Sequence, residues 1–206
     1  MSISYEATGR RQQKARTRTA LVDAARHVLA GGASPTIEEA AEAAGISRAT
    51  AYRYFSNQRA LLLAIRPQLE ALSLLGDPAP NDPAERLERT IAEFTRLTIE
   101  WEPELRATLR LSLEPDRKDE RELVLRQGRA IGWIEEALAP LRSRLSPAAF
   151  RRLVLAIRSA CGIEPLVWLT DIAGLTRDQA ADVMRWSTLA LLRVALDECE
   201  EMNARP

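Results

Sequence analysis

The apolar residues of this 206-residue chain recur mostly three or four positions apart, which is the period of an amphipathic helix. No sustained stretch shows the alternation of apolar and polar residues that predicts a half-buried strand. The pattern therefore predicts an all-α fold with about nine helices. The first helix is expected from about Gln13 to Ala30, where Gly31 and Gly32 end it.

Two short helices are expected next, close together in the sequence. Thr36 caps the first of them, and Glu39 three residues later completes a capping box. Gly45 supplies the positive φ that a tight turn needs, and Ser47 caps the second helix. Two short helices joined by a turn that contains glycine form a helix-turn-helix. The sequence therefore predicts this motif between Thr36 and Phe55.

Turn residues divide the rest of the chain into further helices. A fourth helix begins near Asn57, and Pro67 is expected to kink it. The segment from Gly76 to Asn81 is the clearest loop. The helices expected after this loop run from Asp82-Pro83 to Glu102, from about Glu104 to Leu113, from about Glu120 to Leu138, from Ser146-Pro147 to about Ile172, and from Thr176 to about Glu201.

Charge is distributed unevenly along the chain, although the formal net charge is zero. Residues 1–66 include 10 basic and 5 acidic side chains, whereas residues 67–206 include 19 basic and 24 acidic ones. A basic first third joined to an acidic remainder is expected when one domain meets phosphates and the other does not. The charge pattern therefore predicts a nucleic-acid-binding domain at the N-terminal end.

Membrane attachment and secretion find no support in the sequence. We identify no apolar stretch that approaches the roughly 20 residues needed to cross a bilayer. The run from Leu189 to Leu196 comes closest, and Arg193 interrupts it. The N-terminus is polar and basic, without the apolar core of a signal peptide. We therefore expect a cytoplasmic protein with no membrane partner.

Metal-binding and catalytic motifs are missing as well. Cys161 and Cys199 are too few for a disulfide framework, and His27 without a CxxC spacing makes no structural zinc site. The chain has no GxSxG, no glycine-rich phosphate loop and no HExxH. We expect no enzyme activity, no catalytic residue, no metal and no cofactor. Cys161 is expected to behave as a small buried hydrophobe rather than as a thiol sensor.

A set of residues at fixed spacing runs through the helix-turn-helix and into the following helix. They are Ala41-x-x-Ala44-Gly45-Ile46-Ser47-x-x-Thr50-x-Tyr52-x-Tyr54-Phe55, followed by Leu61-Leu62. This order and spacing, near the N-terminus of a helical chain, resembles the TetR family of transcriptional regulators. The motifs cover about Gln13 to Ile65, and beyond them the resemblance rests on length and helix count.

By this resemblance, the second helix of the motif is the recognition helix. Arg48 is expected to read a base, because arginine pairs bidentately with guanine, worth about 1–3 kcal/mol of discrimination. Thr50 and Tyr52 are expected to hold phosphates through their hydroxyls, and Thr36 and Ser47 to present backbone amides. The expected DNA-binding residues are Arg16, Arg18, Thr36, Ser47, Arg48, Thr50, Tyr52, Arg53, Tyr54, Asn57 and Arg59.

Two positions depart from the family pattern. Gln58 stands where the family often has a lysine, so one phosphate contact is expected to be lost or moved to Arg59. Val28 and Leu29 replace an aromatic residue near the end of the first helix, which should only repack the core. The basic segment from Arg10 to Arg18 is either a solvated tail or an arm that touches DNA.

The resemblance implies a DNA-binding domain at residues 1–66 and a ligand-binding and dimerisation domain at residues 67–206. Arg158 and Glu164 lie in an otherwise apolar stretch, where a buried charge needs a partner. A pair with each other, or across the dimer, is favoured over contact with a ligand. Candidate pocket residues, although most aromatic residues at helical spacing are core, are Phe94, Trp101, Trp133, Arg158 and Trp168.

The last two long helices are the expected dimer interface. Their apolar residues cover more than one face, so one face suits the subunit core and another suits a partner helix. A two-fold dimer also suits DNA, because two recognition helices must reach half-sites about 34–36 Å apart. The expected interface residues are Leu153, Ile157, Trp186, Leu189 and Val194.

These observations lead to one function and one alternative. The expected function is that of a repressor, binding a palindromic operator in double-stranded DNA as a homodimer and released by a small-molecule inducer. The alternative is a DNA-binding dimer that needs no ligand, or an activator. The sequence identifies neither the inducer nor the operator.

Overall fold

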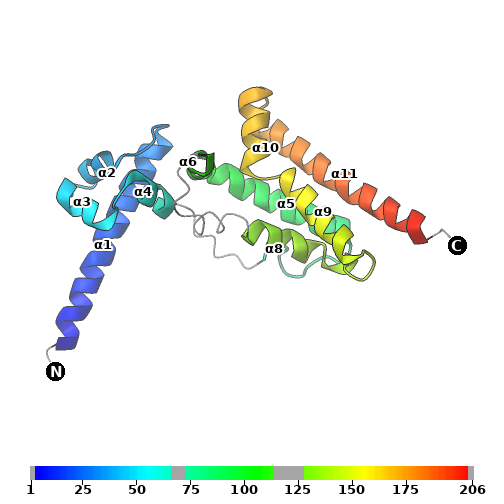
Figure 1. Cartoon of the computed structure of the whole chain (residues 1–206), viewed down its shortest axis with the longest axis horizontal. Helices are drawn as coiled ribbons and strands as arrows, with labels where there is room; N and C mark the ends of the chain where they lie inside the picture. Colours follow the sequence, from blue (N-terminus) through cyan, green and yellow to red (C-terminus); the bar gives the residue numbers. More distant parts are fainter. Residues whose placement is uncertain (1–2, 66–72, 114–127, 204–206) are drawn as a thin grey trace. The chain divides into compact units, whose positions relative to one another are not determined.

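The computed structural model describes residues 3–65, 73–113 and 128–203 (Figure 1). Every regular element in these ranges is a helix, which confirms the predicted all-α fold. The chain forms two compact units. The first comprises Met1–Gln68 and Pro103–Glu114, and the second comprises Leu69–Glu102 and Pro115–Pro206. The sequence did not predict that residues 103–114 pack with the first unit.

The first unit contains five helices within the described ranges. The first of them begins at Ile3, well before the expected start near Gln13. The expected start was late because the apolar periodicity begins late, although nothing in the earlier residues stops a helix. In Figure 1 its N-terminal half extends beyond the three helices that follow it. The five are α1 (Ile3–Ala30), α2 (Ile37–Ala43), α3 (Arg48–Tyr54), α4 (Gln58–Ile65) and α6 (Glu102–Leu113).

Alanines at the centre of the first unit bring its short helices close together. Ala25 of α1, Ala40 and Ala41 of α2, and Ala51 of α3 are fully buried in one apolar cluster. Phe55, directly after α3, is buried in the same cluster. Because these side chains are small, α2 and α3 pack tightly against each other and α2 against α1. The core therefore holds α3 in place while its opposite side faces outward.

The second unit is built around the four helices α5 (Pro83–Glu100), α8 (Gly128–Ala137), α9 (Pro147–Ser159) and α11 (Arg177–Asn203), which lie side by side in Figure 1. Their inward faces bury one large apolar cluster that includes Leu87, Ile134, Val154 and Leu192. In chain order the elements are α5 (Pro83–Glu100), α8 (Gly128–Ala137), a 3-10 turn (Ala139–Leu141), α9 (Pro147–Ser159), α10 (Ile163–Val167), a π-helical turn (Trp168–Ile172) and α11 (Arg177–Asn203).

Capping residues begin α5, α9 and α11 where the sequence predicts. Asp82 accepts a hydrogen bond from the Glu85 amide at 3.0 Å, and Ser146 accepts one from the Ala149 amide at 3.2 Å. Thr176 and Gln179 form a reciprocal pair at the start of α11. The helix expected from Glu120 is described only from Gly128, and its earlier residues lie outside the described ranges, as does Pro67.

The segment expected as one helix from Ser146-Pro147 to Ile172 is interrupted. α9 ends at Ser159, and α10 begins at Ile163 after Gly162, whose φ is 101°. Within Pro147–Ile172, an 18-residue window has a mean hydropathy of 1.5, so by length and composition this stretch is apolar enough to cross a membrane. This differs from the expectation that no stretch of the chain is apolar enough to span a bilayer. Nearly half of that window, 44%, is buried within the unit, as expected of a core helix.

Candidate nucleic-acid interface

The capping box predicted at the start of α2 is present. The Thr36 hydroxyl accepts a hydrogen bond from the Glu39 amide at 3.1 Å, and the Thr36 amide donates to Glu39 Oε2 at 2.8 Å. Hydrogen bonds from the Thr36 backbone and side chain hold the pKa of Glu39 below its ordinary value. Two of the free amides at the N-terminus of α2 are therefore satisfied, which fixes where the helix-turn-helix begins.

A tight turn joins α2 to α3. Gly45 has a φ of 65°, a conformation that glycine adopts without steric cost. The Ile46 amide donates to the Ala41 carbonyl at 2.8 Å and closes the turn. Ser47 then caps α3, accepting from the Thr50 amide at 3.3 Å and donating its hydroxyl to Thr50 Oγ1 at 2.9 Å. Because Thr50 Oγ1 accepts this bond, its own proton remains available for an acceptor outside the protein.

The outward side of α3 is polar and partly cationic. Arg48 and Arg53 are exposed, and Tyr52 is 46% exposed. Tyr54 is also among the expected DNA-binding residues, but it is half-buried and packs against the core of the first unit. It lies three residues after Ala51 and next to Phe55, so it shares their inward side. The exposed surface of α3 therefore consists mainly of Arg48, Tyr52 and Arg53, with Thr50 at its edge.

Tyr52 bridges the two helices of the motif. Its hydroxyl donates to Glu38 Oε1 at 2.6 Å, and Glu38 lies in the first turn of α2. This bond, with a smaller contribution from the Arg48 charge, lowers the pKa of Glu38, and the same bond raises the pKa of Tyr52. The sequence gives no local signal for this bond, because the two residues are 14 positions apart.

The residues just after α3 bind within the first unit. Asn57 accepts a hydrogen bond from the Ala60 amide at 2.8 Å and caps α4. Gln58, which stands at the family's lysine position, donates to the Pro35 carbonyl at 3.0 Å. Arg59 donates to the Leu111 carbonyl of α6 at 3.4 Å and is only half-exposed. Its guanidinium is therefore engaged with α6, and this orientation does not support the idea that it replaces the missing lysine.

Positive charge on α1 lies beside the end of the recognition helix. The Arg18 guanidinium is 5.5 Å from the centre of the Phe55 ring, in a cation–π contact. Arg16 is exposed on the same helix. Because α1 is helical from Ile3 to Ala30, these arginines stand on a rigid helix and not on an extended tail. Whether they touch DNA stays a prediction.

The candidate pocket residues do not all come together in the second unit. Phe94 and Trp133 pack as a tilted aromatic pair with ring centres 6.0 Å apart, and Trp133 is buried. Trp101 is half-buried at the end of α5. Trp168 is 59% exposed, on the π-helical turn, so it does not line the interior with the others. The sequence identified these aromatic residues as candidates for a pocket, but it did not show which of them face inward.

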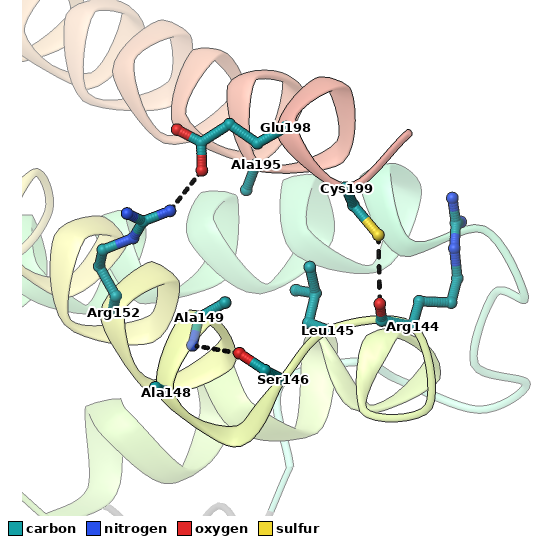
Figure 2. A pocket seen from close by; sticks show the side chains of 9 residues that line it. All are labelled: Arg144, Leu145, Ser146, Ala148, Ala149, Arg152, Ala195, Glu198 and Cys199. Carbon is teal, nitrogen blue, oxygen red and sulfur yellow. Dashed lines mark hydrogen bonds and ion pairs between the residues drawn. The ribbon is translucent and has the colours of Figure 1, made fainter. Parts of the chain in front are cut away.

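A surface pocket of about 380 Å³ lies where α9 and α11 meet, and Figure 2 shows the side chains around it. Arg152 of α9 and Glu198 of α11 form an ion pair at its edge, and the Cys199 thiol donates to the Arg144 carbonyl at 3.1 Å. None of the candidate pocket residues lines it.

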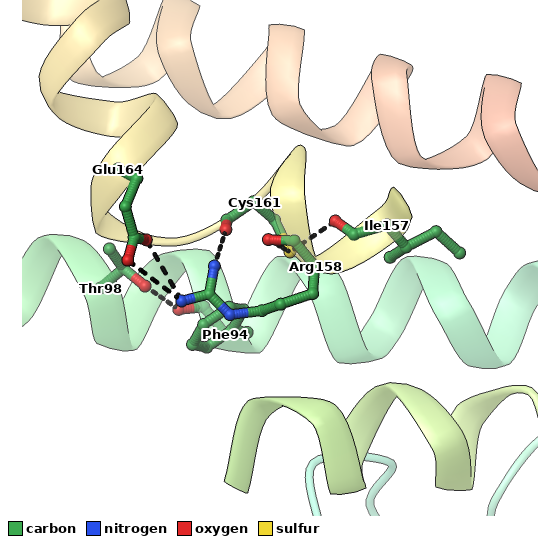
Figure 3. A network of polar contacts seen from close by, with 6 residues as sticks. All are labelled: Phe94, Thr98, Ile157, Arg158, Cys161 and Glu164. Atoms are coloured by element: carbon green, nitrogen blue, oxygen red, sulfur yellow. Dashed lines mark hydrogen bonds and ion pairs between the residues drawn. The ribbon is translucent and has the colours of Figure 1, made fainter. Parts of the chain in front are cut away.

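Arg158 and Glu164 form an ion pair, with Arg158 Nη2 at 3.2 Å from Glu164 Oε2 (Figure 3). Arg158 Nη1 also donates to the Cys161 carbonyl at 2.8 Å, and the guanidinium lies 5.9 Å from the centre of the Phe94 ring. The two charges therefore satisfy each other at the break between α9 and α10, which is one of the pairings that the sequence allowed.

Two of the residues expected at the dimer interface are buried within their own unit. Leu153 and Ile157 are buried in the core of their own unit, because the apolar residues of α9 gather on its inward side. Leu189 is half-buried and packs against the same core. Trp186 and Val194 of α11 are 71% and 55% exposed. The periodicity identified apolar faces but not which of them the subunit covers itself.

Cys161 is expected to react slowly with thiol reagents. It is fully buried, its thiol donates to the Ile157 carbonyl at 3.2 Å, and burial raises its pKa to about 12. Because the thiolate is the nucleophile, little of it exists near pH 8. In a Cys199→Ser variant, Ellman's reagent should label Cys161 far more slowly in the native protein than in guanidinium. Equal rates in the two states would contradict this burial and reopen a sensing role.

The arrangement of the first unit belongs to a recognisable class of protein. A recognition helix held by side-chain caps, with arginine and tyrosine outward and a basic helix beside it, defines a helix-turn-helix DNA-binding protein. Residues 21–65 match the family model described as bacterial regulatory proteins, tetR family. The first unit therefore carries the DNA-binding domain of that family, which supports a DNA-binding transcriptional regulator. No match is found among curated proteins or solved structures.

Proposed function

We propose that this protein is a cytoplasmic homodimeric repressor that binds a palindromic operator and is released by a small molecule. The observation that carries the proposal is the outward face of α3, where Arg48, Tyr52 and Arg53 are exposed. The opposite side of the helix is buried at Ala51. A rigid, cationic helix of this kind fits the major groove of DNA.

Each exposed residue of α3 has a role that follows from its chemistry. Arg48, in the first turn, is the base reader, because recognition helices contact base edges through their N-terminal residues. Thr50 and Tyr52 donate hydroxyl hydrogen bonds to phosphates, which set the register. Arg53 and the arginines of α1, Arg16 and Arg18, add attraction to the backbone and make binding dependent on salt.

A second copy of the chain is the proposed partner of α11. Val183, Trp186 and Val194 are exposed and lie along one side of this helix, and Leu155 of the adjacent α9 is exposed as well. Exposed apolar residues that follow one side of a helix are typical of an interface. A dimer through these helices presents two recognition helices to the two halves of a palindrome.

The second unit is the proposed site of the inducer. On α5, the buried hydroxyls of Thr90 and Thr95 make no hydrogen bond with any residue in the described part of the chain. A buried hydroxyl without a partner is unfavourable, and a polar group on a bound molecule would satisfy it. For release, the inducer must bind the non-DNA-binding state more tightly, typically by about 1–3 kcal/mol.

Selection of binding sites from a random duplex library tests the proposal. The purified protein, at a fixed and stated salt concentration, should enrich a palindrome with two half-sites. Placing the selected site over a promoter should then lower expression of a reporter. Failure to enrich any sequence would remove the proposed function, whereas increased expression would make the protein an activator at the same site.

A further inference from the structure

The bond between Tyr52 and Glu38 crosses the surface that is proposed to face DNA. Tyr52 lies on the outward side of α3, and Glu38 lies in the first turn of α2. The phenol donates to the carboxylate at 2.6 Å, a short bond to a charged acceptor. A bond of this type holds the tyrosine ring in one orientation while the protein is free.

A phenol has a single proton to donate, and both a carboxylate and a phosphate only accept. Tyr52 is therefore unable to donate to Glu38 and to a phosphate at the same time. If its hydroxyl binds a phosphate, the bond to Glu38 must break first. The two acceptors compete for one hydrogen atom.

The negative charge of Glu38 also lowers the affinity for DNA, as the competition for the Tyr52 hydroxyl does. The positive charge of Arg48 makes a small contribution to lowering the pKa of Glu38, so the two opposite charges interact. A negative group beside the proposed base reader offsets part of that arginine's attraction to DNA, and it repels phosphates directly.

We propose that Glu38 is a positioning residue that restrains DNA binding, because its carboxylate holds the Tyr52 hydroxyl until a phosphate replaces the carboxylate as the acceptor. This inference rests on the proposed function, because it requires α3 to meet DNA. It assigns Glu38 a role opposite to that of its neighbours on the same surface. The free protein is then held in a state of lower affinity by one local bond.

The test compares Glu38→Ala with Glu42→Ala. Glu42 is exposed on the same helix, so its variant loses the same charge and the same side-chain type but leaves Tyr52 bonded. The readout is the dissociation constant for the selected palindrome at several salt concentrations. We expect Glu38→Ala to bind about tenfold more tightly than Glu42→Ala, because the Tyr52 hydroxyl then has no charge-assisted bond to break before it donates to a phosphate.

A second pair of variants isolates the tyrosine. In a Tyr52→Phe background, the tenfold difference between Glu38→Ala and Glu42→Ala should fall to about twofold, because the competing hydroxyl is gone and only the effect of the Glu38 charge on Arg48 and on phosphates is left. Thermal unfolding of each variant shows whether it is folded when its affinity is compared.

The outcomes separate this inference from the proposed function. Equal affinity of Glu38→Ala and Glu42→Ala with Tyr52 present, or weaker binding by Glu38→Ala, would overturn the restraint while leaving a DNA-binding protein. A wild-type protein that binds neither the selected nor a random duplex would overturn the proposed function and this inference with it.

Discussion

Replacing Trp186 with aspartate is expected to separate the dimer into monomers and to weaken operator binding by roughly 10²–10⁴-fold, since linked half-sites gain that much over single ones. Trp186 is 71% exposed on α11, between Val183 and Val194 on the same side. A charged group at the centre of an apolar interface would be buried without a partner. Sedimentation at micromolar concentration and operator titration measure the two effects.

Arg185→Gln is the matched control for this substitution. It changes the net charge by the same amount, but Arg185 is directed to Glu88 of α5, with Nη1 at 2.7 Å from Oε1. An exposed ion pair of this kind contributes little to stability. The control should remain dimeric and bind as wild type does. A dimeric Trp186→Asp would exclude this side of α11 as the interface.

Replacing Gly162 with alanine is expected to lower the free energy of unfolding by about 1–3 kcal/mol, the cost of a residue forced into a region that only glycine occupies freely. Its φ is 101°, and an added Cβ would meet Arg158 Nη1 at 3.0 Å. That guanidinium has little freedom to move, because it is bonded to the Cys161 carbonyl and to Glu164. The break between α9 and α10 would have to rearrange.

Gly132→Ala is the control for this prediction. Gly132 lies in the middle of α8, and an added Cβ there would meet nothing within 4 Å. Alanine is favoured over glycine inside a helix by roughly 1 kcal/mol, so this variant should be as stable as wild type or more so. Chemical denaturation of the two variants measures the difference. Equal stability would mean that the positive φ of Gly162 is not required.

Local signals in the sequence predicted the helix-turn-helix well. The capping box of Thr36 and Glu39, and the Ser47 cap, each involve residues within three positions of each other. Such interactions depend on the backbone of a single turn, so their residues can be recognised without a fold. The match to the family model covers the same part of the chain.

Interactions between distant residues could not be predicted in the same way. The bond from Tyr52 to Glu38 and the bond from Arg59 to Leu111 depend on how helices pack, which a periodic pattern does not specify. The break at Gly162 was missed because apolar residues continue on both sides of it. Periodicity also identified Leu153 as apolar without revealing that its own subunit covers it.

The central claim, that α3 reads DNA sequence through Arg48, is tested most directly by repeating the site selection with Arg48→Ala. Arg89→Ala, which removes an exposed arginine paired with Glu85 in the second unit, is the control for lost charge. We predict that Arg48→Ala loses about 1–3 kcal/mol of preference at one position in each half-site, while Arg89→Ala keeps the wild-type palindrome. An Arg48→Ala protein that selects the wild-type palindrome with undiminished preference at every position would contradict the claim.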